Sequence, residues 1–171
     1  MSLRRIKGFT LVELMVTIAI VTILATIAFP SFQATLRSNR TAAAHNELLG
    51  LANSARSEAI RNNGGGGVCG SSTGTSCDGQ WGAGILAFGD SNGNGTFDSA
   101  EAALRYVAVS SSMTVTGPST LVAFDARGRR RDASDQSWVM QPVKCATSET
   151  LRRTITVNAS GQVSSVKGAC Q

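Results

Sequence analysis

One polar segment has residue types and spacing suited to binding a calcium ion. The segment "DSNGNGTFDSAE" (90–101) fits D-x-[DN]-x-[DN]-G-x5-E, a pattern that gathers oxygen atoms around a hard cation. In this interpretation Gly95 permits the sharp turn that the loop needs. The oxygen ligands would come from Asp90, Asn92, Asn94, the carbonyl of Thr96, Asp98 and Glu101.

The same segment also has the composition of an ordinary turn. Asn, Asp and Gly favour turns through their side-chain hydrogen bonds and their backbone freedom. The flanking residues predict strands, whereas an EF-hand loop lies between two helices. Two interpretations therefore stay open: a calcium loop, and a turn between strands in a protein without a cofactor.

A second group consists of four arginines in "ARGRRRD" (126–132). Guanidinium groups this close together attract phosphates, so the cluster is a candidate DNA-binding patch. The alternative is a charged loop exposed to solvent. The four residues are Arg127, Arg129, Arg130 and Arg131.

No residue pattern predicts catalysis. His45 is the only histidine of the sequence, and no nucleophile is recognisable as its partner. The run Gly64–Gly67 follows a predicted helix instead of preceding one, which indicates a flexible joint and not a phosphate-binding loop. Trp81 and Trp138 are interpreted as core or rim residues. We therefore predict that the protein is not an enzyme.

The elements that hold these residues read as one long helix followed by strands. Helical periodicity extends from about residue 9 to residue 62, with Leu48, Ala52, Ala55 and Ala59 on one face, and "NNGGGG" ends it. This order of elements predicts an α+β fold, in which the helix packs on an antiparallel sheet domain. Strands are expected at 81–88, 103–110, 112–116, 120–126, 137–143, 153–158 and 162–166.

The first half of this helix is apolar enough to span a membrane. No charge occurs in the 23 residues from Leu14 to Leu36, and about 20 suffice to cross a bilayer. Basic residues precede the run, which predicts a cytoplasmic N-terminus. A cleaved secretory signal and a plain anchor are alternatives, but Glu13 opens the run, where such signals carry no acid. Pro30 is expected to kink or locally melt the helix.

The sequence "KGFTLVELMVTIAI" (7–20) resembles the N-terminus of type IV pilins and pseudopilins. The resemblance implies that prepilin peptidase cleaves after Gly8 and that Phe9 is then N-methylated. It also assigns assembly roles to Glu13, which would pair with the N-terminal amine of a neighbouring subunit, and to Pro30. The expected divisions are a leader (1–8), a transmembrane or filament-core half (9–32), an amphipathic half (33–62) and a β-rich globular domain (63–171).

The remaining chain resembles the H-type branch of minor pseudopilins and pilins through "W-x-x-G-x-x-x-F-x-D-x-N-x-N-G" and a later "F-D-x-x-G". This implies a subunit that helps initiate or cap a type IV pilus or a type II secretion pseudopilus. Its partners would be other pilins, the peptidase and the bacterial inner membrane, with the globular domain in the periplasm. Some minor pilins of this branch bind DNA through a G-R-x-R motif. "GRRR" (128–131) fits that motif and gives DNA uptake as the alternative function.

Four cysteines follow the apolar run, and an even number in an exported domain favours disulfides over thiols. Three pairings are possible. We predict Cys69–Cys77, which closes a loop rich in Gly, Ser and Thr, and Cys145–Cys170, which fixes the C-terminus.

Overall fold

The computed structural model describes residues 8–171 and contains one long helix followed by eight strands. Helix α1 spans Leu11–Asn62, close to the helix that the sequence predicts. Contacts divide the chain into two compact parts, which meet between Asn39 and Arg40. Residues 1–7 of the predicted leader lie outside the described residues.

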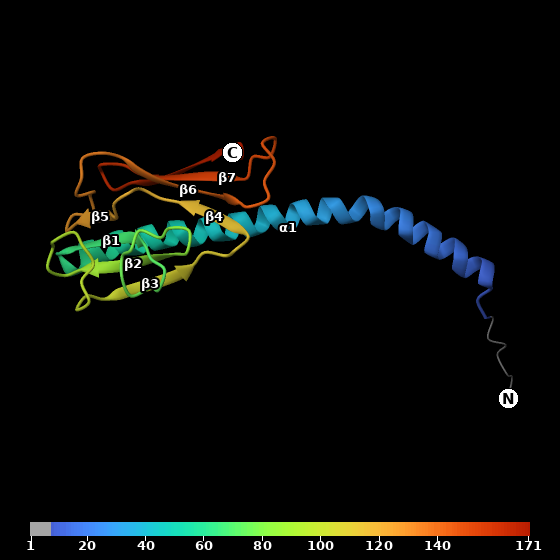
Figure 1. Ribbon diagram of the computed structural model, residues 1–171, viewed down its shortest axis with the longest axis horizontal. Coiled ribbons are helices and arrows are strands. Elements are labelled where there is room, and N and C mark those ends of the chain that lie inside the picture. The colour runs from blue at the N-terminus through green and yellow to red at the C-terminus, as the bar shows by residue number, and fades with distance from the viewer. Residues whose placement is uncertain (1–7) are drawn as a thin grey trace, which may run out of the picture. The chain divides into compact units, whose positions relative to one another are not determined.

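In the first part, the helix begins with a side-chain cap. The hydroxyl of Thr10 accepts a hydrogen bond of 3.2 Å from the backbone N–H of Glu13, as an N-cap residue does. Helical structure then continues through Pro30 without a break, and Figure 1 draws the blue half of α1 as one ribbon. Pro30 therefore does not melt the helix locally, and the alternative expectation, a kink at Pro30, stays a prediction.

The end of α1 is fixed by Asn62. Its side-chain oxygen accepts hydrogen bonds from the N–H groups of Gly64 (2.8 Å) and Gly65 (3.2 Å). Asn63 adopts a positive φ of 52°, a conformation that Asn tolerates better than most residues. The chain reverses here and enters the first strand, so "NNGGGG" ends the helix as predicted.

Two antiparallel four-stranded sheets make up the rest of the second part. The first sheet has the order β3-β2-β1-β5 and the second sheet the order β4-β6-β7-β8. The strands of the first sheet are β1 (Gly65–Gly70), β2 (Gly84–Asp90), β3 (Ala103–Ala108) and β5 (Val122–Asp125). Those of the second sheet are β4 (Met113–Thr116), β6 (Gln136–Pro142), β7 (Arg152–Val157) and β8 (Val163–Gly168).

Strand β1 replaces the flexible joint that the glycine run was expected to form. It is fully buried and pairs with β2 on one side and with β5 on the other. A Cβ atom on Gly66 would lie 2.5 Å from the backbone oxygen of Ala55 in α1, and one on Gly67 would lie 2.6 Å from the ring of Phe88. Glycine is therefore required here because the helix and the sheet approach each other so closely.

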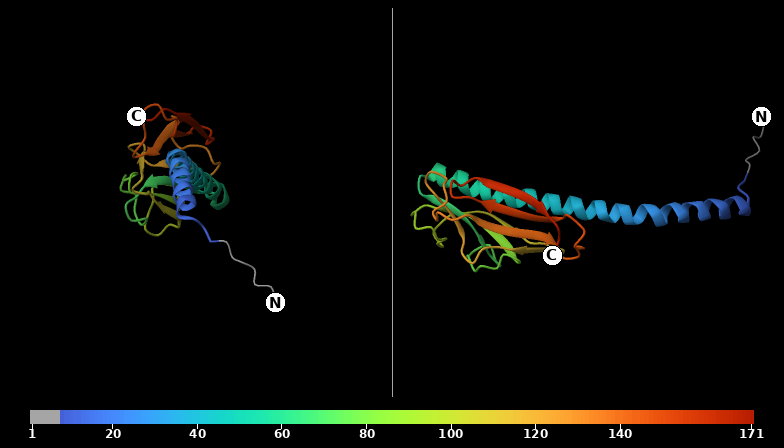
Figure 2. Two further views of the ribbon diagram at one scale, coloured as in Figure 1. Left: turned by 90° about the vertical axis from the view of Figure 1, so that its right-hand side faces the viewer. Right: turned by 90° about the horizontal axis from the view of Figure 1, so that it is seen from above.

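Both sheets share one core with the C-terminal half of α1, and they lie on different sides of it in Figures 1 and 2. The helix contributes the predicted face of Leu48, Ala52, Ala55 and Ala59. Trp81 and Trp138 stack in this core with ring centroids 6.0 Å apart, which confirms their interpretation as core residues.

We expect Gly66→Val to lower the free energy of unfolding by about 1–3 kcal/mol, because its side chain would collide with the backbone of Ala55. Chemical denaturation of the detergent-solubilised chain measures the change. Gly168→Ala is the matched control, since nothing lies within 4 Å of its Cβ position. Equal stability of the two variants would contradict the close packing of β1 on α1.

Candidate functional site

Glu13 is the unusual residue of the first part of the chain. Within residues 8–171 its carboxylate has no hydrogen-bond or ion-pair partner, whereas the hydroxyls of Thr17, Thr22 and Thr26 bond to carbonyls of their own helix. The helix around and beyond Glu13 carries large apolar side chains on all of its faces, and each of these side chains is more than half exposed. They include Phe9, Leu11, Val12, Leu14, Met15, Val16, Ile18, Ile20, Val21, Ile23, Leu24, Ile27, Phe29 and Phe32.

These exposed apolar side chains indicate a helix that is surrounded by lipid or by other protein chains. A helix that is apolar all round is stable only in lipid or inside a packed assembly. The helix is also long and apolar enough to cross a membrane. A single carboxylate in such surroundings needs a positive partner, since an unpaired charge in an apolar medium is costly.

Gly8 and Phe9, the residues of the predicted cleavage site, lie just before the helix. Both are exposed and neither belongs to α1, which begins at Leu11. A segment outside the helix can enter the active site of a peptidase without unwinding a helix. Cleavage and N-methylation themselves stay predictions.

The segment Asp90–Glu101 forms a loop between β2 and β3 that is closed by its own hydrogen bonds. The buried carboxylate of Asp90 accepts the N–H groups of Asn94 (3.0 Å) and Gly95 (2.7 Å). The carboxylate of Asp98 accepts the side-chain amides of Asn92 and Asn94, at 2.8 Å each. Glu101 accepts the N–H groups of Ser91 (2.9 Å) and Asp98 (3.0 Å).

A positive side chain already lies beside this loop. The guanidinium of Arg131 donates a hydrogen bond to the carbonyl of Gly93 and lies 3.8 Å from the carboxylate of Asp90. In the described part of the chain, no three His, Cys, Asp or Glu side chains form a group that could hold a metal. The N–H and the hydroxyl of Thr96 both donate to the side-chain oxygen of Asn94, which is itself one of the predicted ligands. Calcium binding stays a prediction, and the loop conformation is explained without it.

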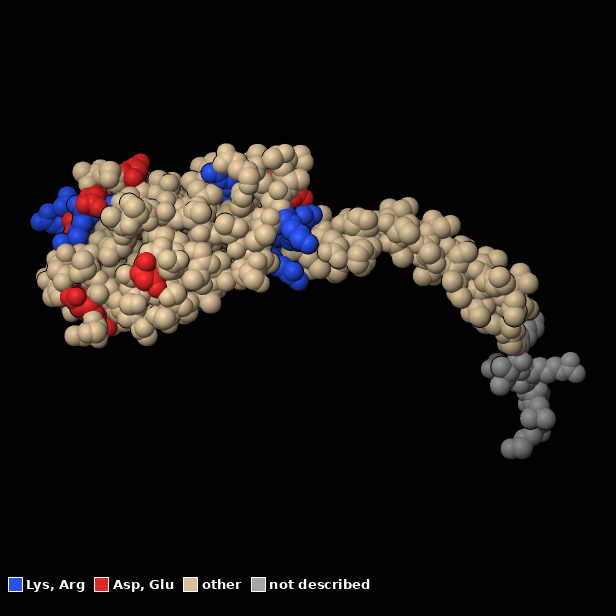
Figure 3. Space-filling model, in the orientation of Figure 1, with Lys and Arg blue, Asp and Glu red and all other residues tan. Residues whose placement is uncertain are grey.

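The arginine cluster does not form a continuous basic surface. The side chain of Arg130 is fully buried and pairs with Asp132 at 3.2 Å, so its assignment to an exposed DNA-binding patch is wrong. Arg129 pairs with Asp125 at 3.2 Å, and Arg131 holds the loop described above. Arg127 is exposed. In Figure 3 blue and red atoms lie side by side at the left end of the domain.

The pKa values of Asp125 and Arg130 reflect the ion pairs inside this cluster. Burial acts to raise the pKa of Asp125, but the N–H groups of Arg129 and Arg127 and the guanidinium of Arg129 outweigh burial and lower that pKa. Burial also lowers the pKa of Arg130, and the charges of Asp132 and Asp135 oppose this effect. Three of the four arginines therefore pair with aspartates of the same domain: Arg129, Arg130 and Arg131.

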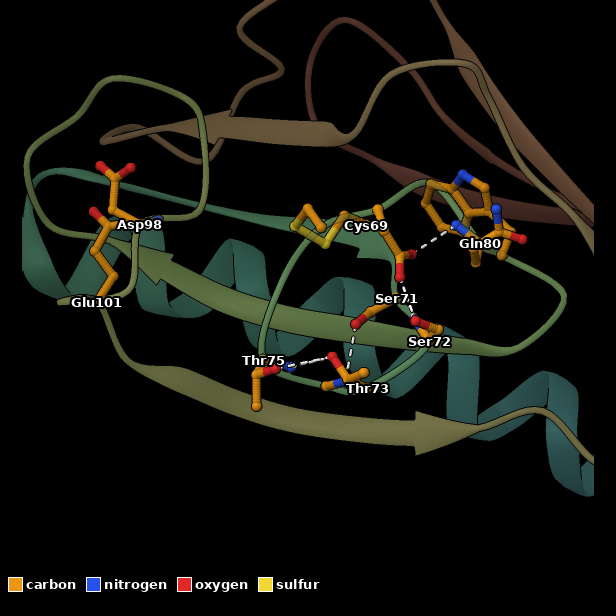
Figure 4. Close-up of a disulfide and its surroundings, with 12 residues drawn as sticks. Cys69, Ser71, Ser72, Thr73, Thr75, Gln80, Asp98 and Glu101 are labelled. Atoms are coloured by element: carbon orange, nitrogen blue, oxygen red, sulfur yellow. Dashed lines mark hydrogen bonds between the residues drawn. A yellow bond between two sulfur atoms is a disulfide. The ribbon is translucent and has the colours of Figure 1, made fainter.

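Both predicted disulfides are present. Cys69 pairs with Cys77 and Cys145 with Cys170, with Cα atoms 5.6 Å and 5.8 Å apart. The first closes a loop of hydroxyl residues over the sheet, where Ser72 bonds to Asp78 and Thr73 to Thr75 (Figure 4). Beneath this loop, Cys77 packs with Phe97 against a small second core of Cys69, Leu86 and Phe88.

His45 joins α1 to the second sheet. Its Nε2 atom lies 2.6 Å from the hydroxyl of Ser165 in β8, and its Nδ1 atom lies 3.3 Å from Asn46. Partial burial lowers the pKa of His45 from 6.5. The charges of Arg153 and Lys167 add to this effect, and the contact with Asn46 opposes it.

The long apolar helix, which continues into a domain of antiparallel sheets, defines the pilin class of filament subunits. Two family models match the chain: "Type II transport protein GspH" over residues 44–161, and "Prokaryotic N-terminal methylation motif" over residues 3–29. Because the first match covers more than half of the sequence, the chain belongs to the GspH family of pseudopilins and minor pilins.

Two crystal structures of the type IV minor pilin FimU from Pseudomonas aeruginosa strain PAO1 are similar in fold. Each is 18% identical in sequence, with TM-scores of 0.51 and 0.52. The similarity covers 72% of this chain and 90% of FimU in one crystal form, and 74% and 87% in the other. A search of curated protein sequences gives no match.

We expect Asp90→Ala to destabilise the domain by about 3 kcal/mol, because two N–H groups lose their buried acceptor and the partly exposed guanidinium of Arg131 loses its partner. Thermal or chemical unfolding measures the loss. Asp98→Ala in the same loop is the control, with an expected loss of about 1 kcal/mol, because only two Asn amides depend on it. If Asp98→Ala lowers the free energy of unfolding as much as Asp90→Ala does, the buried carboxylate of Asp90 is not the main stabilising group of the loop.

The lowered pKa of His45 predicts how stability depends on pH. Since the unfolded chain binds this proton more tightly than the folded chain, stability falls as the pH drops below about 6.5 and is flat above it. Unfolding curves of the wild type and of His45→Gln, recorded from pH 5 to pH 8, isolate this contribution. The account fails if the two proteins lose stability in parallel below pH 6.5.

Proposed function

We propose that this chain is a minor subunit that helps initiate or cap a type IV pilus or a type II secretion pseudopilus. The observation that carries the proposal is the carboxylate of Glu13, which has no partner within residues 8–171 and lies on an exposed apolar helix. In the proposed mechanism, neighbouring helices of the filament cover the apolar surface. The amine of Phe9 from an adjacent subunit supplies the missing positive charge.

Processing would create that partner. Before cleavage, Phe9 is joined to Gly8 through a neutral peptide bond, and only removal of the leader gives it a charged amine. Two opposite charges inside an apolar filament core attract strongly, but either one alone is costly to bury. The ion pair would therefore stabilise filaments of cleaved subunits, whereas an uncleaved subunit would leave Glu13 without a partner.

The proposed location follows from the same segment. Arg4, Arg5 and Lys7 precede the apolar helix and favour a cytoplasmic N-terminus. The helix would then lie in the inner membrane and the disulfide-containing domain in the oxidising periplasm. In this proposal the peptidase, the membrane and other pilins are the partners, and the chain acts by assembly and not by catalysis.

We expect Glu13→Ala to insert into the membrane and to be cleaved after Gly8, but to enter filaments at least about tenfold less than wild type, because the neighbouring amine is left unpaired. Immunoblots of sheared filaments and of membranes, together with the mass of the processed chain, measure both steps. Thr17→Ala, one turn along the helix, is the matched control, since its hydroxyl bonds within the helix. Normal incorporation of Glu13→Ala would contradict the proposed pairing.

The choice between pilus and secretion system needs an assay in cells. Deletion of the gene, followed by measurement of twitching motility and of exoprotein release, separates the two. Loss of twitching alone supports a pilus role, and loss of release alone supports a pseudopilus role. If neither changes, the proposed function is wrong.

A further inference from the structure

Strand β8 forms an edge of the second sheet that no other part of the domain pairs with. It stands last in the strand order β4-β6-β7-β8, and within residues 8–171 no backbone hydrogen bond joins its outer edge to another segment. Four of its six residues are exposed to solvent. Figures 1 and 2 show this strand in red. An unpaired edge of this kind can accept a strand from another chain.

The three other sheet edges are protected in ways that β8 is not. Strand β5 bonds along its outer edge to the segment that follows it, since the N–H of Arg131 donates to the carbonyl of Ala123 (3.0 Å). The register of β3 on β2 contains an irregularity, which turns an edge away from other strands, and β4 is only four residues long. In contrast, all six residues of β8 pair with β7 in unbroken register.

The free edge of β8 offers the backbone groups of three residues. The N–H of Asn158 donates to the carbonyl of Gln162 (3.1 Å), so this pair is a hydrogen-bonded pair of the hairpin. Bonded and non-bonded pairs alternate along an antiparallel ladder. The N–H and C=O groups that point away from β7 are therefore those of Val163, Ser165 and Lys167. An extended segment laid beside β8 would pair with them by strand addition.

Two positive side chains lie opposite each other next to this edge. Lys167 is the cross-strand neighbour of Arg153 in β7, on the face where Ser165 contacts His45 of α1. Within residues 8–171 neither forms an ion pair, and Arg153 donates to backbone carbonyls at 3.1 and 3.3 Å. Like charges directly opposite each other destabilise a sheet. A carboxylate brought in along the free edge would relieve this repulsion.

We propose that an extended segment of a different filament subunit adds as a strand to the free edge of β8 and places an acidic side chain beside Lys167. The inference rests on the proposed function, in which the apolar helices hold this chain next to other pilins. A second copy of β8 is a poor occupant, because its sequence VSSVKG contains no acid and would add another lysine.

Two substitutions of Lys167 separate backbone pairing from the side chain. Lys167→Pro removes an N–H that points outward and leaves the ladder with β7 intact. We expect it to enter filaments at least about fivefold less than Lys167→Ala, which keeps that N–H. Thermal unfolding of both full-length variants in detergent shows whether they fold. Equal incorporation of the two folded variants would overturn the proposal.

Lys167→Glu tests the acidic partner without any change to the backbone. The new carboxylate would face Arg153 within the chain and the acidic side chain of the partner outside it. We therefore expect a thermal midpoint at or above that of Lys167→Ala, but incorporation at least about threefold lower. Incorporation equal to that of Lys167→Ala would contradict the assigned chemistry and overturn the proposal.

A photoreactive residue in place of Val166, which is 67% exposed next to the free edge, identifies the occupant. The same residue in place of the exposed Thr75, in the disulfide loop, controls for non-specific cross-linking. After irradiation of cells, mass spectrometry is expected to find a segment of another pilin. A second copy of this chain, a protein that is not a pilin, or no cross-link would overturn the proposal. Failure of the filament function looks different, because the wild type itself would then be absent from filaments.

Discussion

The apolar surface of residues 9–32 is the constraint on which the rest of this account depends. Its large side chains are exposed around the whole helix, and water is a poor environment for them. Lipid can cover such a surface before assembly, and neighbouring helices can cover it afterwards. In the proposed mechanism, the single carboxylate of Glu13 would make the second environment selective, because the free amine of a cleaved neighbour would neutralise it there.

In the second part of the chain, two sheets pack against one helix. Small residues make this possible: Ala52, Ala55 and Ala59 on α1 face a strand that is mostly glycine. The close approach places β1 in the centre of the first sheet. Disulfides and the Asp90 loop then fix the outer segments, so the domain presents rigid surfaces to its partners.

Much of this architecture could be predicted from the sequence, because hydrophobic periodicity and turn residues report directly on local structure. The helix from Leu11 to Asn62, both cysteine pairings and seven of the eight strands have recognisable signals. Strand β1 was missed, since glycine has no side chain with which to show alternation and its role is set by the contact with Ala55. Trp81 was placed in a strand, but it belongs to a turn before β2.

The candidate sites were harder to predict, because sequence spacing does not show which charges pair. Four adjacent arginines resemble a phosphate-binding patch, yet Arg130 points inward and Arg131 reaches back to Asp90. That second contact also explains why a calcium-like motif can be satisfied internally. Glu13 was identifiable because a lone acid next to an uncharged run stands out without any knowledge of tertiary structure.

The mass and N-terminal sequence of the chain isolated from sheared filaments test the central claim most directly. The account predicts a chain that begins at Phe9, carries one added methyl group on its N-terminal amine and copurifies with the other filament subunits. A chain that keeps residues 1–8, or that is cut after the apolar run and released as a soluble domain, would contradict it.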